Sequence, residues 1–236
     1  MRLDKFLSDT SPMGRKEIKQ HIKKGAVSVN GKTVKDPGMH VDEIKDEVAF
    51  CGETVSYRKF VYLMLNKPDG YVSATYDKHY PVVTDLVDEE YAHFEVFPVG
   101  RLDIDTHGLL LLTNDGDLAH RLLSPKSHVP KTYYVKSEKE VMQDDITAFE
   151  EGIELEDFTT LPGKCKILSA DKKESHLTIF EGKFHQVKRM FEARDNKVLH
   201  LKRISMGSLT LDETLAEGSV RELSNEELES IFNDIN

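Results

Sequence analysis

The feature that most constrains the fold is a polar segment, residues 100–108, which lies between the apolar runs 97–99 and 109–112. Short apolar runs bounded by turn residues are typical of strands inside a sheet. The polar segment carries charged and glycine residues in close succession: Gly100, Arg101, Asp103, Asp105, His107 and Gly108. A polar loop held between buried strands is a common place for catalytic side chains. We therefore take residues 100–108 as the candidate catalytic loop.

The N-terminal part of the chain predicts two short helices and a hairpin. Apolar residues recur at helical spacing in 3–7 and again in 15–24. Residues 27–34 then alternate around an Asn-Gly pair, which is the strongest short hairpin signal. A two-residue turn at this place would pair Val27 with Val34.

The remainder of the chain favours a sheet. Residues 52–59 are predicted to form a linker, and strands are expected at 60–65 and 71–75, among others. Predicted strands outnumber helices and often follow one another directly, which favours a mixed, mainly antiparallel sheet with flanking helices. The predicted fold class is α+β, with a small domain and linker over 1–58 and a larger domain over 59–236.

The distribution of charge indicates a polyanionic partner, although the net charge of the chain is −10. Residues 1–35 hold nine Lys and Arg against three acidic residues, a net charge of +6. Residues 182–203 hold seven Lys and Arg against two acidic residues, a net charge of +5. Residues 138–157, by contrast, carry a net charge of −8. Two basic regions on an acidic body concentrate positive potential locally, which suits the docking of a nucleic acid.

Composition excludes several other classes of protein. Hydrophobic residues make up 39% and charged residues 31% of the chain, as in a soluble globular protein. No apolar run approaches the length of about 20 residues that a membrane span needs. The first seven residues lack the apolar core of a signal peptide, and the two cysteines, Cys51 and Cys165, have no metal-type spacing. We expect a cytoplasmic protein with no membrane partner, acting as a monomer.

The candidate loop carries a resemblance to a known family. Gly-Arg-Leu-Asp-x-x-Thr-x-Gly-Leu at residues 100–109 resembles the signature loop of RNA pseudouridine synthases. The continuation Leu-Leu-Thr-Asn-Asp-Gly at 111–116 is similar to the branch that acts on small-subunit ribosomal RNA. The Asn-Lys-Pro-x-Gly segment at 66–70 also matches this branch, although by itself we interpret it as a turn. The resemblance implies a pseudouridine synthase fold for the larger domain.

Residues 1–50 resemble the S4 RNA-binding domain. The likeness rests on Arg-Leu-Asp-Lys-Phe-Leu at 2–7 and Val-Ser-Val-Asn-Gly at 27–31. In that family the second helix and its adjoining loop face RNA, where basic side chains can contact phosphates. The implied RNA-binding residues are Arg2, Lys5, Arg15, Lys16, Lys19 and Lys23.

By position, the resemblance assigns catalytic roles to Asp103, Tyr133 and Lys188. Asp103 is the family's catalytic aspartate, acting as nucleophile or base, and Tyr133 is the tyrosine of a Lys-x-Tyr motif, which can stack on the uracil and assist proton handling at C5. Lys188, in a motif at 181–190 that resembles the family's third motif, would keep Asp103 ionised. Lys183 stands there where the family usually has arginine. Further RNA-binding candidates are Arg101, Lys131, Lys183, Gln186 and Arg189.

The other aspartates near the loop are interpreted as structural. Asp105 is expected either to be structural or to pair with Arg101, and Asp115 belongs to an Asp-Gly turn. Asp117 is expected to cap the helix that follows.

The implied reaction converts uridine to pseudouridine in ribosomal RNA, most closely in the small subunit. The reaction breaks an N-glycosidic bond and forms a C-glycosidic bond without redox change or water, so no cofactor or metal is expected. The family mechanism requires neither His107 nor His185, so both are left out of the site. Three alternatives stay open: a large-subunit enzyme, an RNA-binding assembly factor without activity, and a carboxylate-based hydrolase that releases uracil, which would want a second carboxylate to activate water.

Overall fold

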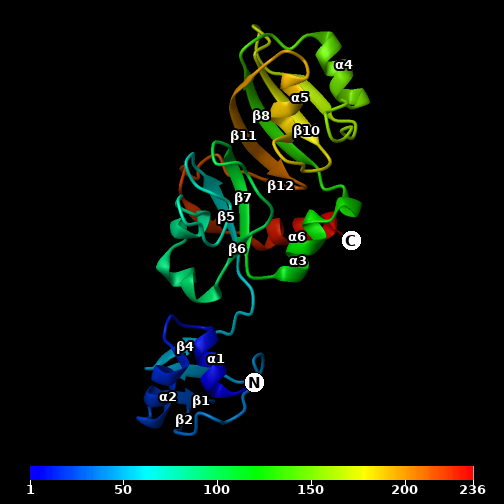
Figure 1. Ribbon diagram of the computed structural model, residues 1–236. Helices are drawn as coiled ribbons and strands as arrows, with labels where there is room; N and C mark the ends of the chain where they lie inside the picture. Colours follow the sequence, from blue (N-terminus) through cyan, green and yellow to red (C-terminus); the bar gives the residue numbers. More distant parts are fainter. Residues whose placement is uncertain (236) are drawn as a thin grey trace. The chain divides into compact units, whose positions relative to one another are not determined.

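The computed structural model describes residues 1–235 as two compact units (Figure 1). Unit 1 comprises Met1–Val61 and Val87–Val96, and unit 2 comprises Tyr62–Leu86 and the chain from Phe97 onward. Asn236, the last residue of the predicted larger domain, lies outside the described residues.

Unit 1 packs two helices against a four-stranded antiparallel sheet of order β2-β1-β3-β4. Its elements are α1 Leu3–Asp9, α2 Arg15–Lys23, β1 Val27–Val29, β2 Lys32–Val34, β3 Val48–Phe50, β4 Glu53–Val55 and the 3-10 helix η2 Glu89–Phe94. The predicted helices and hairpin are confirmed, and Val27 pairs with Val34. Both turn residues, Asn30 and Gly31, have the positive φ that such a turn requires. The predicted linker over 52–59 is wrong in part, because β4 pairs with β3 there.

Asp4 organises the positive charge of unit 1. Its side chain is fully buried, and its carboxylate pairs with Arg2 at 3.1 Å, Arg15 at 2.8 Å and Lys19 at 3.5 Å. The hydrogen bond from Arg2, followed by that from Arg15, outweighs the effect of burial and holds the pKa of Asp4 well below its usual range. A depressed pKa stabilises the fold above the unfolded value of about 4, and this stabilisation is lost as the pH falls toward the folded value.

Replacing Asp4 by asparagine is expected to destabilise unit 1 by about 1–3 kcal/mol at neutral pH, because three cations lose the buried charge that they share. The variant should also lose less stability than the wild type when the pH is lowered below about 4. Hydrogen exchange of the α1 and α2 amides in urea measures both effects. Asp9→Asn is the matched control, since it removes a surface charge that pairs with Lys5 at 2.7 Å and accepts a long hydrogen bond from the Tyr57 hydroxyl at 3.5 Å, and it should cost about 0.5 kcal/mol or less. Equal costs for the two variants would contradict this role of Asp4.

Unit 2 is built on a nine-stranded sheet (Figure 1). Seven strands follow the order β13-β5-β7-β11-β8-β10-β9, while β12 pairs with β11 and β6 pairs with β7. The strands are β5 Tyr62–Lys67, β6 Phe97–Pro98, β7 His107–Thr113, β8 Lys131–Ser137, β9 Lys164–Ile167, β10 Glu174–Ile179, β11 Val198–Met206, β12 Leu209–Thr210 and β13 Val220–Glu222. The β7–β11 pair is parallel and the others are antiparallel, so the predicted mixed, mainly antiparallel sheet is confirmed.

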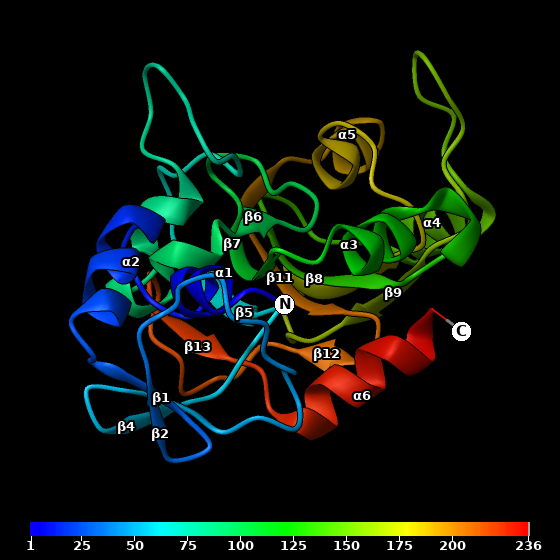
Figure 2. The same ribbon diagram turned by 90° about the horizontal axis from the view of Figure 1, so that it is seen from below.

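Helices cover this sheet and complete its core. They are α3 Gly116–Leu123, α4 Gln143–Glu151, α5 Gln186–Glu192 and α6 Asn225–Asp234, with the 3-10 helices η1 Val83–Leu86 and η3 Pro125–Ser127. Leu109 and Leu111 of β7 share one apolar cluster with α3 and α6, and Figure 2 shows α6 beside β12. The rings of Phe149 and Phe191, 5.1 Å apart, join α4 to α5. No helix among residues 1–235 is long and apolar enough to span a membrane.

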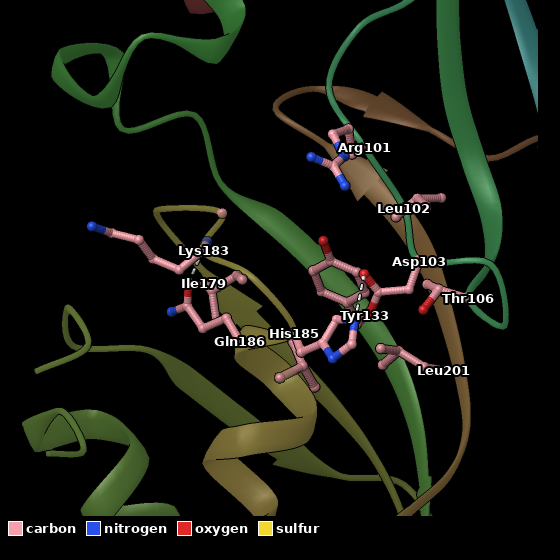
Figure 3. Close-up of a pocket in the computed structure, with 12 residues that line it drawn as sticks. Arg101, Leu102, Asp103, Thr106, Tyr133, Ile179, Lys183, His185, Gln186 and Leu201 are labelled. Carbon is pink, nitrogen blue, oxygen red and sulfur yellow. Dashed lines mark hydrogen bonds and ion pairs between the residues drawn. The ribbon is translucent and has the colours of Figure 1, made fainter. Parts of the chain in front are cut away.

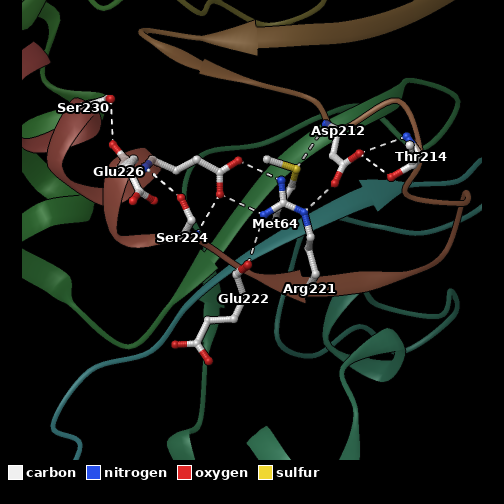
Figure 4. Close-up of polar contacts among 9 residues, drawn as sticks. Met64, Asp212, Thr214, Arg221, Glu222, Ser224, Glu226 and Ser230 are labelled. Atoms are coloured by element: carbon white, nitrogen blue, oxygen red, sulfur yellow. Dashed lines mark hydrogen bonds and ion pairs between the residues drawn. The ribbon is translucent and has the colours of Figure 1, made fainter.

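An ion-pair network fixes the C-terminal part of unit 2 (Figure 4). Arg221 of β13 donates to Asp212 at 2.8 Å and to both carboxylate oxygens of Glu227, in the first turn of α6, at 2.7 and 2.8 Å. Bidentate pairing of an arginine with a carboxylate is geometrically specific, so this contact sets how α6 joins the edge strand.

Two local predictions for unit 2 are wrong. Residues 71–75 do not form a strand, because only Val72 makes an isolated bridge, to Val82. Asp115, rather than Asp117, caps α3, since its carboxylate accepts a hydrogen bond from the backbone N–H of Leu118 at 3.1 Å. The helix begins at Gly116, which moves the cap to the residue before it.

Candidate active site

The candidate loop, now residues 99–106 between β6 and β7, is fastened from beneath by a buried lysine. Lys67, at the end of β5, is fully buried, and its ammonium donates at 3.0 Å to the carbonyl oxygens of Pro68, Ile104 and Thr106. Burial lowers the pKa of Lys67 to about 8. An ammonium group with three carbonyl partners has all its donors used, so Lys67 holds the loop rather than facing solvent.

Ser73 fixes the residue that precedes Asp103. Its hydroxyl accepts from the backbone N–H of Leu102 at 3.0 Å and donates to the carbonyl of the same residue at 2.9 Å. The backbone N–H of Thr106 donates back to the carbonyl of Asp103 at 3.0 Å. The backbone on both sides of Asp103 is therefore constrained, which limits the positions open to its carboxylate.

The sheet supplies the floor of the site. Side chains alternate between the two faces of a strand, so Lys131 and Tyr133 of β8 share one face. On the neighbouring strand β11, Leu201 and Arg203 share a face in the same way, and Arg203 pairs in register with Tyr133. Two adjoining pockets, of about 60 and 330 Å³, open over this floor and have Asp103, Tyr133, Lys183 and other residues in common (Figure 3).

Asp103 lies in these pockets between two basic side chains. Its carboxylate is 3.3 Å from the ammonium of Lys188 and 3.5 Å from Nε2 of His185, and its side chain is 26% exposed. Figure 3 shows the carboxylate beside the ring of Tyr133, with His185 below it. Asp103, Tyr133 and Lys188, which the sequence places on three separate segments, are thus brought together.

Lys188 also binds Asp105, at 2.5 Å, and therefore bridges the two acidic residues of the loop. Partial burial raises the pKa of Asp105, but the hydrogen bond and charge of Lys188 outweigh it and leave the pKa below its ordinary value. Of the two alternatives for Asp105, the pairing with Arg101 is wrong, because Asp105 pairs with Lys188 instead. Arg101 has no ion pair with any residue of the described chain and lines both pockets.

The other RNA-binding candidates of unit 2 differ in how they are held. Gln186 is buried, with its amide donating to Glu181 and accepting from the backbone N–H of Lys183, each at 3.0 Å. An RNA contact by this amide would have to replace one of these bonds. Arg189 pairs with Asp157, and it and Lys183 both lie over the ring of Phe158.

The candidates of unit 1 also fall into two groups. The carboxylate of Asp4 compensates Arg2, Arg15 and Lys19, and Asp9 compensates Lys5. Lys16 and Lys23 are exposed on α2 and have no ion pair with any of residues 1–235.

Sequence reasoning missed four residues of the site. His185 contacts Asp103 although the family mechanism does not require it, and Lys67 holds the loop although the sequence indicates only a turn there. The family-like motifs that contain these two residues were the available signal. Arg203 and the exposed Phe184, whose ring stacks on that of His185 at 3.8 Å, line the larger pocket, and only their place in the second basic region pointed to them. Among residues 1–235, no group of three or more His, Cys, Asp or Glu side chains is placed to hold a metal ion.

Comparison with known proteins shows which family this chain belongs to. Residues 61–193 match the RNA pseudouridylate synthase family model, and residues 1–48 match the S4 domain model. An uncharacterized RNA pseudouridine synthase of Bacillus subtilis is 52% identical over 97% of each chain. The ribosomal small subunit pseudouridine synthase A of Haemophilus influenzae is 41% identical over 98% of this chain and 99% of its own. A crystal structure of a pseudouridylate synthase, 40% identical, covers 98% of this chain and 99% of its own with a TM-score of 0.69. This chain therefore belongs to the RNA pseudouridine synthase family and carries an S4 domain at its N-terminus.

Proposed function

We propose that this protein isomerises one uridine of small-subunit ribosomal RNA to pseudouridine, with Asp103 as nucleophile or base. Residues 1–58 would form the RNA-binding module and linker, and residues 59–236 the catalytic module. In this proposal the protein acts as a cytoplasmic monomer. The arrangement that carries the proposal is the carboxylate of Asp103, held in the pocket 3.3 Å from Lys188 and beside the ring of Tyr133.

The reaction fits these three side chains. The N1–C1′ bond of the uridine breaks, the uracil turns, a C5–C1′ bond forms, N1 gains a proton and C5 loses one. A carboxylate can attack the sugar or remove a proton, and the ammonium of Lys188 lies 3.3 Å from the carboxylate of Asp103. The aromatic face of Tyr133 can stack on a base that is flipped out of the RNA helix. The hydroxyl of the same residue can assist in removing the proton from C5.

The choice of RNA rests on the relatives. Proteins from Haemophilus influenzae and Pasteurella multocida, 41% and 42% identical over nearly the whole chain, are named ribosomal small subunit pseudouridine synthase A. We infer the same class of substrate for this chain, because the likeness extends over both the S4 domain and the catalytic unit.

The test is tritium release from ribosomal RNA that carries 5-tritiated uridine. The small-subunit RNA, free or in an assembling particle, should release tritium with the wild-type protein, and the large-subunit RNA should not. Cells that lack the protein should lose pseudouridine at one small-subunit position when it is mapped. Loss at a large-subunit position instead would replace the proposed substrate, and loss at no position would contradict the proposed activity. Free uracil and abasic RNA would indicate a hydrolase.

Replacing Lys16 and Lys23 together by methionine is expected to weaken RNA binding and to lower the slope of log K against log salt by about 1–2, because two exposed cations stop displacing counterions. Binding titrations of ribosomal RNA at several salt concentrations measure this slope. Lys45→Met is the matched control in the same unit, since Asp42 already lies 3.9 Å from that ammonium. An unchanged slope in the double variant would contradict RNA contact by this face of α2.

A further inference from the structure

Two buried cations face the larger pocket without a carboxylate partner. Lys131, at the start of β8, and Arg203, on β11, are only 8% and 3% exposed. Arg203 pairs in register with Tyr133, two residues along β8 from Lys131, so both cations lie on the face of the sheet that forms the floor of the pocket. They are close enough for the charge of Arg203 to act, after burial, in lowering the pKa of Lys131 to about 8.

Their bonds within the protein leave capacity unused. The Lys131 ammonium donates to the carbonyl of Val129 at 2.7 Å, and Nε of Arg203 donates to that of Leu109 at 2.8 Å. Nη2 of Arg203 is buried and has no hydrogen-bond partner in the described chain. Neither cation forms an ion pair with a carboxylate among residues 1–235.

Such a pair is unfavourable in the absence of an anion. A buried charge without a counter-charge is costly, two like charges side by side add to the cost, and an arginine cannot escape by losing its proton. Asp103, the acidic residue that lines this pocket, is engaged by Lys188 and His185. The pocket of about 330 Å³ also receives Arg101 and Lys183 at its wall, which adds to its positive charge.

We propose that Lys131 and Arg203 bind one phosphodiester group of the RNA, at a linkage that flanks the uridine held over Asp103. This inference rests on the proposed function, because it takes RNA as the substrate. A phosphodiester keeps its negative charge at all working pH values, and the guanidinium fork matches two of its oxygens. The same pocket holds Asp103 and Tyr133, so a phosphate fixed on this floor would set where the adjoining sugar lies relative to the carboxylate.

The test uses an RNA oligonucleotide that contains the target uridine, after the position of that uridine has been mapped in the ribosomal RNA. One linkage at a time, on the 5′ or the 3′ side of that uridine, is replaced by an uncharged methylphosphonate. With the wild-type protein, one of the two replacements should weaken binding by about tenfold or more, as expected for loss of a charge-assisted contact. The Lys131→Met variant should bind the RNA with natural linkages about tenfold less tightly than the wild type does. In this variant, replacing the same linkage by methylphosphonate should weaken binding by about threefold or less.

Two control variants are measured with the same RNAs. Lys166→Met makes the same substitution at an exposed position on β9, and the methylphosphonate should weaken its binding as much as it weakens that of the wild type. Lys131→Arg keeps the charge, so the methylphosphonate should weaken its binding nearly as much. An equal penalty in the wild type and in Lys131→Met, or no penalty at either linkage, would overturn the phosphate site.

A further measurement needs no variant and so does not depend on folding. Between pH 7 and 9 the affinity of the wild type should fall more for the natural linkage than for the methylphosphonate, because Lys131 loses its proton in this range. The other charged or titratable protein groups that face the pocket are the same in both measurements: Arg101, Asp103, Tyr133, Lys183, His185 and Arg203. An identical pH dependence for the two RNAs would count against the site. Failure of the wild type to form pseudouridine in the unmodified oligonucleotide would instead contradict the proposed function, whatever the linkages do.

Discussion

Replacement of Asp103 by asparagine is expected to lower the rate of pseudouridine formation by at least about 10⁴-fold. The amide has the size of the carboxylate but carries no charge, so it can neither attack the sugar nor accept a proton. Lys188 would still hold Asp105 at 2.5 Å, so the substitution does not leave this lysine without a partner. Single-turnover tritium release at saturating RNA isolates the chemical step from binding.

Asp105→Asn is the matched control for this result. It makes the same chemical change two residues along the same loop and removes the other carboxylate bound to Lys188. Because the Asp105 side chain is 60% exposed and Asp103 remains charged, we expect a loss of only about tenfold. Similar residual rates in the two variants would mean that Asp103 has no special role and that the proposed chemistry is wrong.

Replacement of Gly108 by alanine should destabilise unit 2 by about 2–6 kcal/mol, the sum of backbone strain and overpacking. Gly108 has φ +96°, which other residues rarely adopt, and it lies where β7 runs parallel to β11. A Cβ there would collide with the backbone carbonyl of Arg203 and lie 2.8 Å from Cγ of Lys202. The midpoint of thermal unfolding should fall by about 5–20 °C in calorimetry.

Gly116→Ala separates this local effect from a general cost of losing glycine. Gly116 begins α3, its φ is not positive, and open space surrounds the position of a new Cβ. Its replacement should change stability by no more than about 0.5–1 kcal/mol, and in the stabilising direction. If both glycine variants had the same midpoint of thermal unfolding, the close approach of β7 to β11 at Gly108 would not be the cause of the lost stability.

Local patterns in the sequence were sufficient for much of the fold. The Asn-Gly turn that pairs Val27 with Val34 was predictable because its chemistry lies within two residues. The apolar run 109–112 became the buried strand β7 for the same reason. The catalytic assignments drew on family-like motifs, and the structure brings Asp103, Tyr133 and Lys188 to one pocket or one ion pair.

What escaped prediction depends on contacts distant in the chain. Lys67 looks like part of a turn until its ammonium is seen bound to the carbonyls of Ile104 and Thr106. The sequence around Arg203 does not distinguish it from any other basic residue in a strand. Its place in the pocket follows only from the register of β11 against β8. The cap of α3 was misplaced by two residues, because Asp115 and Asp117 are both good capping residues and the sequence does not choose between them.

The place of β11 in the sheet has a consequence for biosynthesis. This strand lies between β7 and β8 and joins the half of the sheet that carries Asp103 to the half that carries Tyr133. Because β11 spans Val198–Met206, a nascent chain must extend past these residues before the two halves can meet. A growing polypeptide that already contains Lys188 but has not reached β11 has the three proposed catalytic residues but lacks the strand that joins the two halves of the sheet. Enzymatic activity should therefore appear only when synthesis of the chain is nearly finished.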